Sequence, residues 1–261
     1  MIKKIGGINM RLEVCCGSYE DALVAINNGA HRIELNSALY LGGLTPSMAT
    51  IKAVLEIAKA KGVSVIAMIR PRGAGFCYNE YEIQMMFEDA KLCLEAGVDG
   101  LAFGFLTKER LIDIDLTKQM CDLIHAYQKE AVFHRAFDCV DDLMLATKQL
   151  IDCKVDRILT SGGQPTAPLG VEVLAKLQAQ FAQEIEILAG CGINADNVIA
   201  LIEQSKVNQV HSSCKDYASD VTTSGTYVNY AYYEGVHRND YECVDAKKVE
   251  AMIQALSKYH K

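Results

Sequence analysis

Short apolar runs and longer segments of helical periodicity alternate along this chain. The segment 47–61 represents the longer kind, because it places Ile51, Val54 and Ala58 on one helical face. The shorter runs have the length of strands, and there are eight of them, at residues 11–16, 31–36, 64–70, 99–103, 131–135, 156–160, 185–189 and 207–212. The pattern therefore predicts eight strands, each followed by a helix.

Strands that alternate with helices pair in parallel through right-handed crossovers. Eight such units favour a (β/α)8 TIM barrel, with an open doubly wound sheet as the alternative. We expect a single TIM-barrel domain over residues 10–261, with residues 1–9 as an N-terminal extension, since Met10 can serve as an alternative start. The segment 215–243 is long, polar and rich in tyrosine, and it predicts an elaborated loop after the eighth strand.

Polar residues stand where the predicted strands end, and a barrel brings all these ends to one rim, where such folds place their chemistry. In the second strand Ile33 and Leu35 are expected to face the helices, so Glu34 and Asn36 point into the barrel. A buried acid needs a partner, and Arg70 at the end of the third strand is the expected one. The alternatives are a structural layer of ion pairs and a charged cavity.

Arg70 and Arg72 flank a proline directly after an apolar run, which indicates something negative nearby, internal or bound. An enzyme acting on a small anionic or phosphorylated substrate would use both as a clamp, together with Arg135. Such an enzyme would draw its general acid or base from Glu34, His134 and Asp138.

The last rim loops contain glycines, in "LTSGG" and "LAGCGIN". Backbone N–H groups there can converge on an anion, the recurrent phosphate site of this fold. The residues that would supply these donors are Ser161, Gly162, Gly163, Gly190 and Gly192. The alternative is that these glycines only form tight turns between strand and helix.

Composition narrows the classes of partner. A net charge of −7 argues against nucleic acid, and no apolar stretch reaches the roughly 20 residues that a membrane span needs. Ten cysteines without a signal peptide predict reduced thiols in the cytoplasm. Thiols near the rim are candidate ligands for Cu(I), led by Cys15 and Cys77, although a free cysteine often only packs as a small hydrophobe.

The stretches "LEVCCGSYEDALVAINNGAHRIELN", "GGLTPS", "MIRPRGAGFCY", "FHRAFD", "LTSGG" and "HSS" together resemble the CutC copper-homeostasis family over about residues 10–215. The resemblance implies a cytoplasmic TIM barrel that handles copper, with Cys15 as the family cysteine that closes the first strand. It also shows a departure, since Asn36 stands where many members have a cysteine. Cys15 is then left with Cys77 or His134 as a partner for Cu(I).

Two hypotheses from different classes stay open, a copper-binding protein and an enzyme on a small anion. Tyrosines in the eighth loop can pack against a second subunit, which predicts a homodimer or higher homo-oligomer, or can cover the rim as a lid. These tyrosines are Tyr217, Tyr227, Tyr230, Tyr232 and Tyr233.

Overall fold

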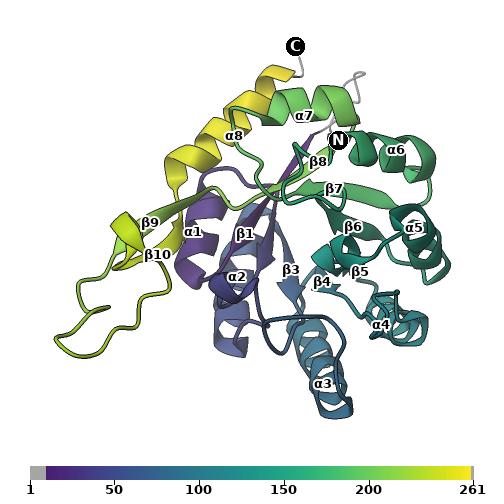
Figure 1. Cartoon of the computed structure of the whole chain (residues 1–261), viewed down its shortest axis with the longest axis horizontal. Coiled ribbons are helices and arrows are strands. Elements are labelled where there is room, and N and C mark those ends of the chain that lie inside the picture. The colour runs from purple at the N-terminus through teal and green to yellow at the C-terminus, as the bar shows by residue number, and fades with distance from the viewer. Residues whose placement is uncertain (1–9, 260–261) are drawn as a thin grey trace.

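The computed structural model describes residues 10–259, so the predicted N-terminal extension, residues 1–9, lies outside the described residues. Eight parallel strands close into a barrel in sequence order (Figure 1). The strands are β1 (Arg11–Cys16), β2 (Arg32–Leu35), β3 (Ser64–Met68), β4 (Gly100–Phe103), β5 (Glu130–Phe133), β6 (Arg157–Thr160), β7 (Glu186–Gly190) and β8 (Gln209–Ser212). The predicted (β/α)8 architecture is confirmed.

The helices follow the strands in turn and surround the barrel (Figure 1). They are α1 (Tyr19–Asn27), α2 (Met48–Lys61), α3 (Glu80–Ala96), α4 (Ile114–Ala126), α5 (Leu143–Asp152), α6 (Val171–Phe181), α7 (Val198–Ser205) and α8 (Ala246–Tyr259). Three short 3-10 turns are η1 (Leu39–Leu41), η2 (Arg135–Cys139) and η3 (Gly235–His237). None of the helices in residues 10–259 has the length and apolar character that crossing a membrane requires.

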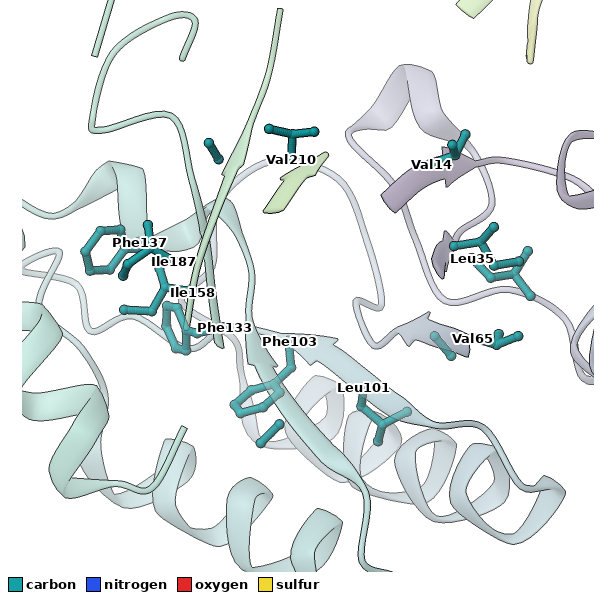
Figure 2. Packing of buried hydrophobic residues seen from close by; sticks show 14 of the residues in the cluster. Val14, Leu35, Val65, Leu101, Phe103, Phe133, Phe137, Ile158, Ile187 and Val210 are labelled. Carbon is teal, nitrogen blue, oxygen red and sulfur yellow. The ribbon is translucent and has the colours of Figure 1, made fainter. Parts of the chain in front are cut away.

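The main core lies between the strands and the helices. Alternate strand residues such as Val14, Leu35 and Phe133 point outward and are fully buried against the helices (Figure 2). The barrel interior contains a small apolar cluster, made of Ile66, Met68, Ala102 and Val132. The other inward positions of β1, β2 and β8 are largely polar, and this polarity determines the character of the barrel mouth.

The elaborated loop after β8 contains regular structure that the sequence pattern did not predict. β9 (Lys215–Ser219) pairs antiparallel with β10 (Asp240–Val244), and the chain between them extends away from the barrel (Figure 1). Tyr40 of η1 packs against Tyr232 and Tyr233, with ring centroids 4.7 and 5.5 Å away. The loop is thereby attached beside the carboxyl end of β2.

Candidate functional site

A cavity of about 250 Å³ opens at the carboxyl ends of the strands. Its lining includes residues from β1, β2 and β8 and from the loops after β3 and β5. The polar and aromatic side chains in its wall include Cys15, Glu34, Arg70, Phe76, His134 and His211. Residues far apart in sequence therefore meet at one opening, as the barrel prediction requires.

Three potential metal ligands lie together on one wall of this cavity. The register of β1 with β2 places Cys15 beside Glu34, and the Cys15 Sγ lies 3.7 Å from Glu34 Oε2. His211 Nε2 lies 4.0 Å from the same carboxylate oxygen. One ligand atom from each of the three residues falls within 4.8 Å of the other two. A thiol, a carboxylate and an imidazole at this spacing can bind a single metal ion.

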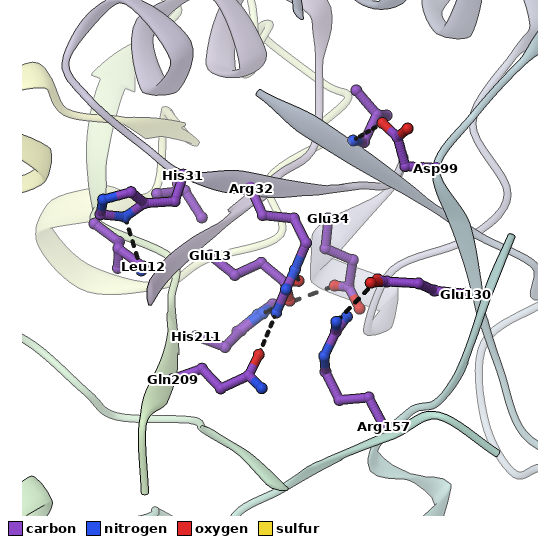
Figure 3. Close-up of polar contacts among 12 residues, drawn as sticks. Leu12, Glu13, His31, Arg32, Glu34, Asp99, Glu130, Arg157, Gln209 and His211 are labelled. Atoms are coloured by element: carbon purple, nitrogen blue, oxygen red, sulfur yellow. Dashed lines mark hydrogen bonds and ion pairs between the residues drawn. The ribbon is translucent and has the colours of Figure 1, made fainter. Parts of the chain in front are cut away.

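The ring of His211 is held from behind by a buried carboxylate. His211 Nδ1 lies 2.8 Å from Glu13 Oε1, and the other oxygen of Glu13 accepts from Arg32 Nε (Figure 3). Arg32 also donates to Gln209 Oε1 at 2.8 Å. Because the ionised Glu13 can only accept, Nδ1 must carry a proton. Burial lowers the pKa of His211, but its hydrogen bond to Glu13 and the charges of Glu34 and Glu13 raise it overall, so Nε2 can carry a proton as well. An arriving ion would displace that proton, and the lone pair of Nε2 would then face the ion beside Cys15 and Glu34.

The pKa values of this group reflect its burial. Burial, and then the nearby Glu34 carboxylate, raise the pKa of the Cys15 thiol well above its usual range. Burial also raises the pKa of Glu34, opposed by the charge of His211. For Glu13 burial alone would raise the pKa, but Arg32 and His211 hold it well below its usual range. Without an ion the thiol is therefore protonated, and an arriving ion would displace that proton.

Arg70 is buried and lines the cavity, but its predicted ion pair with Glu34 is wrong. Its Nη1 donates to the carbonyls of Leu41 and Gly43 at 3.0 and 3.1 Å, and its Nη2 donates to the carbonyl of Ala74 at 2.6 Å. The guanidinium therefore fastens the loops after β2 and β3 to each other. Glu34 instead accepts from Asn36 Nδ2 at 3.0 Å, so the inward parity predicted for Glu34 and Asn36 is confirmed.

Arg72 lies 40% exposed and does not belong to the cavity lining. It forms a bidentate ion pair with Glu82 in the first turn of α3, with Nε 2.5 Å from Oε1 and Nη2 3.2 Å from Oε2. It also donates to backbone carbonyls of its own loop, including that of Cys77 at 3.1 Å. Cys77 is exposed in this loop and is likewise absent from the cavity lining, so the structure does not bring it to Cys15.

The glycine-containing loop after β6 binds a carboxylate of the chain itself, that of Asp138. Asp138 accepts from the backbone N–H groups of Ser161 and Gly163, each at 3.1 Å, and from Thr160 Oγ at 2.5 Å. Arg135 Nε completes this arrangement at 2.8 Å from Asp138 Oδ2. Two of the backbone donors predicted to bind a phosphate, those of Ser161 and Gly163, are therefore bound to a carboxylate of the chain itself.

The remaining glycines serve the packing of the backbone. The N–H of Gly162 donates to Thr160 Oγ at 2.9 Å. A Cβ on Gly190 would lie 2.5 Å from a methyl group of Leu159, so a larger residue there would have to displace the Leu159 side chain. Gly192 has a φ of 71°, a left-handed conformation that suits glycine. Gly192 lines a separate cavity of about 520 Å³ between the loop after β7 and α8.

His134 is buried at the end of β5 on the wall opposite to Cys15. Its Nδ1 accepts from the N–H of Ala136 at 3.2 Å, which starts η2. Burial, and then the charge of Arg70, lower its pKa to about 3, so the ring is neutral near pH 7. Its side chain lies next to Phe76, with ring centroids 5.1 Å apart.

Two members of the site, His211 and Arg32, had no role in the prediction. His211 lies in the predicted strand 207–212, but nothing in the sequence indicated that it faces Cys15. Arg32 stands two residues before Glu34 on the same inward face, so strand parity could have placed its side chain in the barrel interior, and the register of β1 with β2 sets it beside Glu13. The structural ion pair that we considered for the barrel interior is the Glu13–Arg32 pair.

Fold and site together first define a class: a (β/α)8 barrel protein with a candidate metal-binding group at the C-terminal mouth. The chain belongs to the CutC family, whose model matches residues 10–216. A Treponema denticola protein described as a CutC family protein is 46% identical over 203 residues, covering 78% of this chain and 80% of the relative. One from Bacteroides fragilis is 35% identical over 253 residues, covering 95% and 98%.

Solved structures agree with this assignment. A crystal structure from Streptococcus agalactiae, described as a copper homeostasis protein CutC, superposes with a TM-score of 0.74 at 31% identity, covering 78% of this chain and 98% of that one. Thiamine phosphate pyrophosphorylase from Pyrococcus furiosus has a TM-score of 0.59 at 14% identity, over 97% and 99% of the two chains. That second likeness shows the barrel fold alone.

Proposed function

We propose that this chain is a copper-homeostasis protein that binds a metal ion through Cys15, Glu34 and His211. The family to which it belongs and the description of its solved Streptococcus relative support the link to copper. The observation that most supports a metal site is the hydrogen bond from His211 Nδ1 to Glu13 Oε1, at 2.8 Å. Metal-binding histidines almost always donate their second ring N–H to such an acceptor, which fixes the tautomer and the ring.

The donor set fits copper in part. Thiolates select soft ions such as Cu(I), and imidazole also suits copper, so Cys15 and His211 supply two suitable ligands. Glu34 is a harder ligand, and Asn36 donates to it where a second thiol would otherwise stand. A bound ion would be held by the first two and balanced in charge by the third. Zn²⁺ also accepts this combination, so it serves as the competitor in the test.

The test is a titration of the reduced protein with Cu(I) under argon, against the chelator bicinchoninate and then against Zn²⁺. We expect one ion per chain. Glu13→Gln should weaken binding roughly 10- to 100-fold, as for loss of a partner behind a metal ligand, and Cys15→Ser should weaken it further. Cys77→Ser is the matched control and should leave the affinity unchanged. Unchanged affinity in Cys15→Ser would exclude this site.

Location and assembly are proposed on separate grounds. All ten cysteines are free thiols, which supports a reducing compartment such as the cytoplasm. The chain between β9 and β10 exposes Tyr227 by 96% and Tyr230 by 79%, which supports the predicted contact with a second copy. Light scattering on the purified protein measures the assembly, and a monomer at micromolar concentration would contradict it.

A further inference from the structure

Two N–H donors in the wall of the mouth cavity are buried and have no hydrogen-bond partner among residues 10–259. They are Arg70 Nε and His134 Nε2. The hydroxyl of Tyr78 is close enough to the Arg70 guanidinium to interact with it, but it forms no hydrogen bond of acceptable geometry. The residues that carry the two donors are 5% and 3% exposed, and both line the cavity. Buried polar groups in native proteins are nearly always paired, so an unpaired donor beside a cavity calls for an explanation.

Both groups are donors and neither can accept. Arg70 is always protonated. In His134 the Nδ1 atom accepts from Ala136, so the single proton of the neutral ring lies on Nε2. The Nη atoms of Arg70 are tied to three backbone carbonyls, which fixes the direction of Nε. A ligand at this wall must therefore bring an acceptor oxygen to two preset donors.

The ring of Phe76 packs against both side chains. Its centroid lies 5.0 Å from the guanidinium carbon of Arg70 and 5.1 Å from the ring centroid of His134. Phe76 is half-buried in the loop between β3 and α3. A ligand would move this ring aside to reach the donors.

We propose that the mouth cavity binds a small monocarboxylate, with its carboxylate on Arg70 and His134. The two oxygens of a carboxylate can accept from both donors, and Arg70 gives the carboxylate a charged partner. A phosphate dianion fits poorly, because the Glu34 carboxylate lines the same cavity and the loop donors of Ser161 and Gly163 are already bound to Asp138. Met68 and Leu159 supply an apolar surface for a short carbon chain. The subsite needs no metal ion, so it does not depend on the proposed function.

The experiment uses the full chain in EDTA, with pyruvate as the probe and methyl pyruvate as its uncharged counterpart. Calorimetry or saturation-transfer NMR should show that pyruvate binds and that the ester binds at least tenfold more weakly. Arg70→Gln should weaken pyruvate roughly 10- to 100-fold, since it removes a charged donor, whereas Arg72→Gln should change nothing. Phe76→Ala and Glu34→Gln should both tighten binding, by uncovering the donors and by removing a negative charge.

Several results would overturn the subsite. The subsite is excluded if pyruvate and methyl pyruvate bind equally well. It is also excluded if Arg70→Gln and Arg72→Gln have equal effects, or if neither the wild type nor Phe76→Ala shows saturable binding of pyruvate. If Arg70→Gln does not fold, because Arg70 fastens two loops, His134→Leu takes its place with the same expected loss. The chelator keeps this outcome separate from the metal titration.

Discussion

Two corners of the barrel mouth look alike in sequence but differ in structure. At the ends of β1, β2 and β8, Cys15, Glu34 and His211 meet with ligand atoms within 4.8 Å of one another. At the end of β6, the N–H groups of Ser161 and Gly163 both point at the Asp138 carboxylate. Polar groups stand at strand ends in both corners. In the first corner the side chains face a cavity and can bind a ligand. In the second corner the Asp138 carboxylate already accepts from the donors.

The largest effect is expected from the ion pair beneath the first corner. Arg32 and Glu13 have side chains only 2% exposed, so Arg32→Met leaves a carboxylate buried without its main partner. We expect the free energy of unfolding to fall by about 3–5 kcal/mol, measured by urea denaturation. The control is Arg110→Met, whose pair with Asp141 is exposed by 65% and 77%, and it should cost at most about 1 kcal/mol. Equal losses in the two variants would contradict a special role for the buried pair.

A smaller loss is expected in the second corner. Asp138→Asn replaces an acceptor oxygen by an amide N–H that faces other donors, and should destabilise the fold by about 2–3 kcal/mol. Because Asp138 serves the loop, metal affinity should stay the same in the same variant. A large drop in metal affinity with unchanged stability would reverse the roles that we assign to the two corners.

The pH dependence of stability tests the state of His134. Its pKa falls from 6.5 to about 3 on folding, so between these pH values the ring is protonated in the unfolded chain and neutral in the folded one. Stability from this group is therefore complete above pH 6.5 and is lost as pH falls toward 3, by up to about 1.4 kcal/mol per pH unit. Urea denaturation at neutral and at mildly acidic pH should show a smaller drop in His134→Gln than in wild type. The same drop in both would contradict a buried, neutral ring.

The last prediction is that inorganic phosphate leaves the unfolding temperature unchanged. Because Asp138 occupies the donors of the loop after β6, inorganic phosphate should not raise the unfolding temperature beyond the effect of chloride at equal ionic strength. A specific rise that depends on phosphate concentration and disappears in Gly163→Pro would show that the loop accepts an outside anion after all.

The sequence supported the barrel well, because alternating strands and helices are a local property repeated eight times. Strand parity also placed Glu34 and Asn36 on the inward face, since it needs only a period of two. Partners across the rim were harder. Arg72 pairs with Glu82, and Arg70 with loop carbonyls, because the loop conformations after β2 and β3 decide which acceptors come within reach. Those conformations have no periodic signature.

The same limit explains the metal ligands. Cys15 could be placed at the end of β1 by pattern, but its neighbours depend on the register of β1 with β2 and β8. That register aligns Glu13 with His211 and Cys15 with Glu34. A pattern of apolar residues fixes which face a side chain occupies, but not which residue of the next strand lies beside it.

The most direct test of the metal site is a crystal structure of the reduced protein soaked with Cu(I), with anomalous data at the copper edge. We predict one anomalous peak at the barrel mouth, within bonding distance of Cys15 Sγ and His211 Nε2, with Glu13 still hydrogen-bonded to His211 Nδ1. A peak at exposed thiols such as Cys77 or Cys139, with the mouth empty, would contradict it.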